Sequence, residues 1–207
     1  MTEAIRDYLS YVGIQYRNPD KAGDEREKML ELRHKGQEAR KTFTNLAKTF
    51  QEKHPEWRLQ QTSQWMNQAQ RLRPHFWVYL QREGQVTEPM LALRLYGEPS
   101  DFGISLEVSF IERKKDEQTL SKQAKILDIP PVKGIYYLVY TDGQSQKLEA
   151  DEENRLLLRT KVRNQEIRKV LVKSDVSFIE NQTLEAILEK LEDAYERLLP
   201  YYERTRG

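Results

Sequence analysis

The chain has 207 residues, which is enough for one large domain or two small ones with a core that needs no disulfide or metal. It contains no cysteine, so thiolate nucleophiles, cysteine zinc sites and disulfides are excluded together, and a reducing compartment is favoured. Its 34 Lys and Arg residues almost cancel its 33 Asp and Glu residues, so binding to nucleic acid or an anionic membrane would need a local patch.

The first residues lack the basic region and apolar core of a signal peptide, and no apolar run approaches the roughly 20 residues that span a bilayer. An aromatic content of 10% is typical of chains that fold. We therefore expect a folded, soluble, cytoplasmic protein with no membrane partner.

Two helices are predicted in the first quarter of the chain. The first runs from Thr2 to Val12 and ends at Gly13, and the second covers about Asp24 to Lys53. The second has a stripe of apolar and small residues spaced alternately three and four apart. Its members are Met29, Leu32, Gly36, Ala39, Phe43, Leu46 and Phe50. The stripe could join two chains in a coiled-coil homodimer, but the small Gly36 and Ala39 favour packing on the chain's own core.

The middle of the chain contains the clearest strand pattern. His54-Pro55 ends the long helix, and the polar segment 57–72 is predicted to be a short helix that packs across the sheet. Three runs with alternating apolar residues follow: HFWVYLQ (75–81), MLALRLY (90–96) and ISLEVSFIERK (104–114). They predict a three-strand meander.

The last part of the chain alternates between helical and strand patterns. Thr119 to Leu127 is predicted as a short helix, and Gly134 to Thr141 as a strand that ends at the hairpin signal Asp142-Gly143. Segments 155–163 and 167–173 suggest a second hairpin, and the acidic run 151–153 suggests a loop. An amphipathic helix should begin near Asn181 and stop at Pro200.

These elements predict a single α+β domain over residues 1–207. Its sheet should be mostly antiparallel, made of the three-strand meander and C-terminal hairpins. The long N-terminal helix and the amphipathic C-terminal helix should pack on it.

Alternation along the strands separates a core face from a polar face. The core face is apolar throughout. The other face carries His75, Trp77, Tyr79, Arg94, Tyr96 and Glu107. A simple register puts Trp77, Arg94 and Glu107 in one cross-strand row, where the arginine could stack on the ring and pair with the carboxylate at once. A stacking ligand such as a nucleobase would need such a surface. The alternative is that a helix covers this face.

A second candidate site lies at the charged end of the third run. Glu112-Arg113-Lys114 looks like the Glu-x-Lys element of metal-dependent nucleases. Asp101 is about 36 Å away at ~3.3 Å per strand residue, too far to share a cation with Glu112. Glu88 starts the facing strand, although parity puts it on the opposite face from Glu112. The alternative function is thus a nucleic-acid hydrolase using Glu88, Glu112 and Lys114.

Other chemical signatures are missing from the sequence. The nine glycines are scattered, the three histidines lack metal-ligand spacing, and no serine sits in a G-x-S-x-G elbow, so we predict no cofactor, metal or catalytic residue. Basic residues between Arg155 and Lys173 could contact phosphates or could form a solvated sheet face.

The segments FWVYLQ (76–81) and SLEVSFIERK (105–114) resemble those of a family of small uncharacterised bacterial proteins of unknown function. This resemblance implies no activity. The sequence thus predicts a binding module rather than a catalyst. Its ligand would be a small molecule, a nucleic acid or a protein partner, and a scaffold that self-associates through the N-terminal helix is the third reading.

Overall fold

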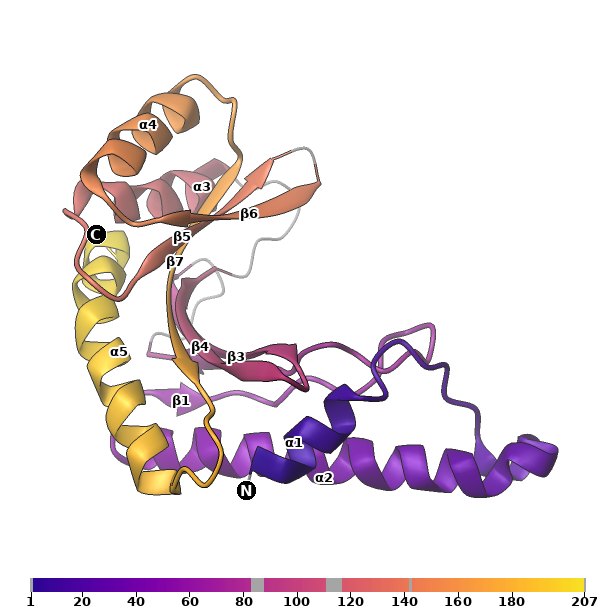
Figure 1. The fold of residues 1–207 in the computed structure, drawn as a ribbon. Coiled ribbons are helices and arrows are strands. Elements are labelled where there is room, and N and C mark those ends of the chain that lie inside the picture. The colour runs from indigo at the N-terminus through magenta and orange to yellow at the C-terminus, as the bar shows by residue number, and fades with distance from the viewer. Residues whose placement is uncertain (1, 83–87, 111–116, 142, 207) are drawn as a thin grey trace.

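The computed structural model describes residues 2–82, 88–110, 117–141 and 143–206 (Figure 1). The helices are α1 (Thr2–Leu9), α2 (Arg26–Glu52), α3 (Glu117–Ala124), α4 (Glu152–Arg163) and α5 (Leu184–Arg206), with short 3-10 helices η1 (Pro19–Lys21), η2 (Gly23–Glu25) and η3 (Lys125–Asp128). The strands are β1 (Arg58–Leu59), β2 (Trp77–Gln81), β3 (Met90–Glu98), β4 (Asp101–Ser109), β5 (Tyr136–Thr141), β6 (Gln144–Glu149) and β7 (Lys169–Ser177).

The described strands form one antiparallel sheet in the order β1-β2-β3-β4-β7-β5-β6. The predicted α+β class is confirmed, and so is the meander, which is β2-β3-β4. The C-terminal strand β7 pairs with β4 on one side and with β5 on the other. This insertion joins the two halves of the chain in one sheet.

The helices gather on the apolar side of the sheet. In Figure 1, α2 runs beneath β3 and β4, while α5 lies against β7. The inward residues of the meander are fully buried there, from Val78 on β2 to Leu93 on β3 and Leu106 on β4. The predicted core face is therefore correct. None of the described helices has the length and apolar character needed to cross a bilayer.

The stripe on α2 packs within the chain itself. Each of its residues is buried, and Phe43, which has no exposed surface, lies 5.8 Å from the Phe76 ring between centroids. The favoured prediction, that this stripe packs on the chain's own core, is thus confirmed, and self-association through the N-terminal helix stays a prediction.

The predicted helix at 57–72 is wrong. After the short strand β1, this segment runs along the edge of the sheet, where the amides of Gln60 and Ser63 donate to the carbonyls of Tyr79 and Trp77. Gln70 takes a positive φ of 56°, which a continuous helix does not allow. Backbone amides of this segment therefore bond to the carbonyls of β2 and not to those of a helical turn.

The predicted second hairpin and acidic loop are also wrong, because 152–163 is the helix α4. The Asp151 carboxylate caps it by accepting the Asn154 amide at 2.7 Å, and Glu152 and Glu153 fill the first turn, where the helix dipole favours acidic groups. Residues 169–173 belong to β7, a central strand rather than one arm of a local hairpin.

The C-terminal helix does not stop at Pro200 but continues to Arg206. Proline removes one backbone hydrogen bond and costs about 3 kcal/mol inside a helix. Beyond it, Tyr201, Tyr202 and Thr205 are completely buried. Burying a large side chain contributes roughly 1.5–3 kcal/mol, so this last turn offsets the cost of the proline.

Candidate functional site

Glu107 lies at the centre of the polar side of the sheet and has no exposed surface. The Lys173 ammonium of β7 lies 3.0 Å from one of its carboxylate oxygens, and Arg94 Nη2 of β3 lies 3.1 Å from the other. Burial alone would raise the pKa of Glu107, but the charges of Lys173 and Arg94 outweigh it and hold that pKa below its usual value. One buried carboxylate is therefore shared by two cations.

Arg94 contacts an aromatic ring as well as this carboxylate. Its guanidinium carbon lies 5.4 Å from the centroid of the Trp77 ring, which the Arg73 guanidinium also approaches, at 4.8 Å. Arg94 thus stacks on Trp77 and pairs with Glu107 at once, as predicted from the face of the sheet that these three residues share.

The strand register differs by two residues from the predicted row. Trp77 does pair with Arg94, but the partner of Arg94 on β4 is Ser105, while Glu107 faces Ala92. Arg94 reaches Glu107 diagonally. The alternation had placed these side chains on the correct face without fixing which residues stand opposite each other.

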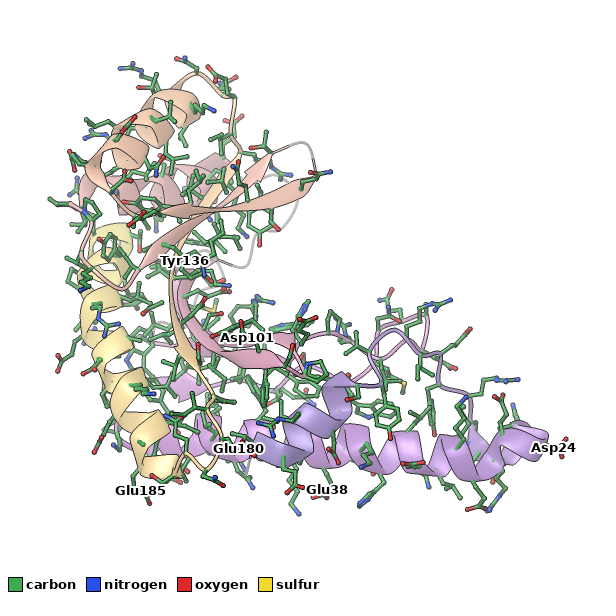
Figure 2. All side chains as sticks on the ribbon, in the orientation of Figure 1. Asp24, Glu38, Asp101, Tyr136, Glu180 and Glu185 are labelled. Carbon is green, nitrogen blue, oxygen red and sulfur yellow. The ribbon has the colours of Figure 1, made fainter. Side chains whose placement is uncertain are left out.

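The C-terminal half supplies residues that sequence reasoning missed. Tyr136 of β5 pairs with Lys173 in the ladder, and its hydroxyl donates to Asp175 at 2.8 Å. Lys147 of β6 also contacts Asp175, at 2.9 Å, and its ammonium lies 3.8 Å from the centroid of the Tyr136 ring. Tyr136 lies at the bend of the sheet, on the far side of β7 from α5 (Figure 2).

We use the term charged face for the aromatic and charged residues that these contacts join on the polar side of the sheet. They are Arg73, Trp77, Arg94, Glu107, Tyr136, Lys147, Lys173 and Asp175. The alternation of side chains along β5 and β7 is the signal that could have identified Tyr136, Lys173 and Asp175 as members of this face.

The other predicted site residues border this face. His75 lies 5.6 Å from Trp77 between ring centroids, and burial together with Arg94 and Arg73 lowers its pKa to about 4. Burial also raises the pKa of Tyr79, although hydrogen bonding to Arg94 opposes that rise. Tyr96 is further along β3, where its hydroxyl lies 3.0 Å from Ser177 Oγ.

No helix among the described residues covers the charged face. The described helices pack against the apolar residues on the other side of the sheet (Figure 1). Trp77 and Tyr79 remain half-exposed, Tyr140 at the end of β5 is exposed, and a quarter of the Arg94 side chain is accessible. The arrangement offers cations beside aromatic rings to a ligand from solution.

The residues of the alternative hydrolase site do not form a metal centre in the described part of the chain. Glu88 pairs with Lys122 of α3 at 2.8 Å, while Glu112 and Lys114 lie outside the described residues. Within those residues no group of three or more His, Asp or Glu side chains could hold a metal ion.

The basic run from Arg155 to Lys173 is divided between two places. Arg155, Arg159, Lys161 and Arg163 lie on α4, whereas Lys173 is buried in the charged face. It therefore forms no continuous sheet face.

A scan against protein-family models finds no match for this chain, and a search of curated proteins finds no similar sequence. The resemblance to uncharacterised bacterial proteins stays a prediction.

Proposed function

We propose that this chain is a non-catalytic, cytoplasmic binding module whose charged face accepts a phosphorylated nucleobase, presented by a mononucleotide or by single-stranded nucleic acid. The observation that carries the proposal is the sharing of one buried carboxylate, Glu107, by Arg94 and Lys173 beside the rings of Trp77 and Tyr136. The cytoplasmic location rests on the absence of cysteine.

The balance of charge on this face favours an anion. Four cations, Arg73, Arg94, Lys147 and Lys173, face two carboxylates, those of Glu107 and Asp175. Lys169 and Glu149, which follow the same alternation on the outer strands, cancel each other. Glu98 and Asp101 have the same alternation on β3 and β4 but lie at the far end of that hairpin, so the excess of positive charge is confined to the rows around Glu107 and Tyr136. An approaching phosphate would compensate the excess of positive charge, and phosphate contacts supply much of the affinity for nucleic acids.

The planar side chains on the same face, the Arg94 guanidinium and the aromatic rings around it, are groups on which a nucleobase can stack. The Arg94 guanidinium is held by Trp77 on one side and Glu107 on another, so its plane is fixed before a ligand arrives. Bases stack on arginine planes as well as on aromatic rings, and half-exposed Tyr79 and exposed Tyr140 add rings at the rim. Preorganised planes reduce the entropy lost on binding.

The test is a fluorescence and thermal-shift titration with a nucleoside monophosphate, the matching nucleoside, inorganic phosphate and an oligo-dT strand. Lys147→Gln is the main variant, because its side chain is 60% exposed and can be changed without disturbing the core. We expect binding to weaken several-fold in Lys147→Gln and with added salt, and to stay unchanged in Lys41→Gln, which removes an exposed charge on α2.

The probes separate the sources of the ligand. Preference for the oligonucleotide would indicate single-stranded nucleic acid, and preference for the mononucleotide would indicate a small molecule. Absence of binding, or equal binding by wild type and Lys147→Gln, would overturn the proposal. Magnesium-dependent cleavage that Glu112→Ala abolishes would favour the hydrolase instead.

A further inference from the structure

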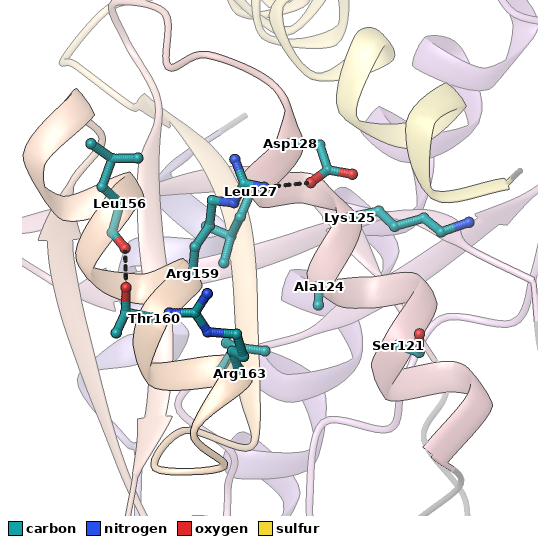
Figure 3. Close-up of a pocket in the computed structure, with 10 residues that line it drawn as sticks. Ser121, Ala124, Lys125, Leu127, Asp128, Leu156, Arg159, Thr160 and Arg163 are labelled. Atoms are coloured by element: carbon teal, nitrogen blue, oxygen red, sulfur yellow. Dashed lines mark hydrogen bonds and ion pairs between the residues drawn. The ribbon is translucent and has the colours of Figure 1, made fainter.

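A groove separates α4 from the segment formed by α3 and η3, on the helical side of the molecule (Figure 3). Its volume is about 470 Å³, within the range of sites that hold small ligands or the side chains of a partner. Ala124, Leu127 and Val162 give it apolar walls, and Leu156, Arg159 and Arg163 line it from α4. No part of the charged face contributes to it.

The arginines of this groove exceed the negative charge available to them. Asp128 accepts two hydrogen bonds from Arg204, at 2.7 and 3.0 Å, while its contact with Arg159 is 3.8 Å. Arg163, one turn beyond Arg159, makes no hydrogen bond or ion pair with the part of the chain that is described. Since the whole chain has a net charge of +1, this is a local concentration of positive charge rather than a general property.

Apolar side chains on α4 are exposed beside these arginines. Leu156 is 50% exposed and Leu157 is 46% exposed, although Leu158, the next residue, is buried in the core. Leu156 lines the groove and Leu157 is exposed next to it on α4, and exposed leucines gain free energy when a partner covers them. A ligand that offered only phosphate would leave them in water.

We propose that this groove docks an acidic amphipathic helix of a protein partner. The apolar side chains of that helix would cover Leu156 and enter the groove, and its carboxylates would pair with Arg159 and Arg163. Helices bind grooves in this way when apolar residues recur every three or four positions. The described residues that line the groove include no aromatic ring, so they offer none of the stacking on which single-stranded nucleic acid depends.

The test measures fluorescence anisotropy of a labelled peptide helix with Leu on one face and Glu on the other. We expect Arg159→Gln/Arg163→Gln to weaken its binding about tenfold, because two paired charges are lost, and Leu156→Gln to weaken it several-fold. Lys41→Gln/Lys48→Gln removes the same net charge from exposed positions on α2 and should leave binding unchanged. Circular dichroism of each variant verifies that α4 is still folded.

Two control ligands separate docking from simple charge attraction. A scrambled peptide of the same composition should bind at least several-fold more weakly, since its leucines no longer share a face. The proposal is overturned if no peptide binds at millimolar concentration, if the scrambled peptide binds equally, or if the variants weaken binding to anionic vesicles or oligo-dT but not to the helix. The result of this test is independent of the nucleotide titration, because Lys147 belongs to the charged face and does not line the groove.

Discussion

At the scale of single residues, the charge on Glu107 depends on its two partners. The carboxylate is completely buried, and Lys173 beside it is only 6% exposed. Removing one partner of a buried pair leaves the other charge without compensation, which typically costs 3–5 kcal/mol. We therefore expect Glu107→Gln to lower the free energy of unfolding by roughly 3 kcal/mol, as measured by urea denaturation.

The matched control for Glu107→Gln is the double variant Glu107→Gln/Lys173→Met, which removes both buried charges. It should recover much of the lost stability, because Arg94 has a quarter of its side chain exposed and can be hydrated. Additive effects of the two single substitutions in a double-mutant cycle would show that the pair is not coupled.

His75 should make the stability depend on pH on the acid side of neutrality. Burial and the nearby arginines lower its pKa to about 4 in the folded state, against about 6.5 in an unfolded chain. As the pH falls from about 6.5 to 4, the unfolded chain binds a proton that the folded chain does not, so stability is lost. His75→Gln should flatten the measured free energy of unfolding across this window.

The comparison that isolates His75 is His34→Gln, a matched substitution at an exposed position of α2. If both variants show the wild-type slope between pH 4 and 6.5, the neutral state of His75 does not contribute to stability. Urea titrations at four or five pH values are sufficient to measure these slopes.

At the scale of elements, the close contact between α2 and the 57–72 segment depends on a glycine. A Cβ at Gly36 would lie 2.5–2.6 Å from atoms of the Trp65 ring, which is itself buried. Alanine is the better helix former by about 1 kcal/mol, yet overpacking a filled core costs about 1–3 kcal/mol. Gly36→Ala should therefore destabilise the protein, as monitored by thermal unfolding.

A neighbouring substitution distinguishes packing from helix propensity. Gln37 is exposed on the same helix, so Gln37→Ala should change the stability by no more than about 0.5 kcal/mol. An increase in stability for Gly36→Ala would mean that Trp65 can move away and that the contact is not tight.

The same scale explains which elements could be predicted from sequence. The meander and α2 have regular periods because each packs one face on the core, and both were correctly placed. In α4, the run Leu156-Leu157-Leu158 obscures the helical period, because two of these leucines are exposed and only the third is buried. The local pattern therefore indicates a strand where the structure has the helix α4.

The candidate site was predictable only in part for a related reason. Trp77, Arg94 and Glu107 belong to neighbouring strands, so alternation alone brought them to one face. Lys173 and Tyr136 join them because β7 inserts between β4 and β5, a pairing between segments far apart in the chain. No local pattern specifies that pairing, since it depends on the tertiary packing of α5 against β4 and β7.

At the scale of the whole molecule, one core connects the two ends of the chain. The Trp57 indole donates to the Tyr195 hydroxyl at 3.1 Å and packs edge-on against Tyr202, so the segment after α2 is fixed to α5. The pairing of β4 with β7 also joins the strands of the N-terminal half to those of the C-terminal half in one sheet. A chain joined by both contacts should unfold as one unit.

The three tryptophans allow this cooperativity to be measured, because all of them, Trp57, Trp65 and Trp77, lie in the N-terminal half. Their fluorescence reports on that half, whereas far-ultraviolet circular dichroism includes α4 and α5 from the other. We expect the two signals to follow one urea transition with the same midpoint, because neither half keeps its buried surface without the other. Separate midpoints would contradict a single domain over residues 1–207 and would show that β7 can leave β4 while the meander stays folded.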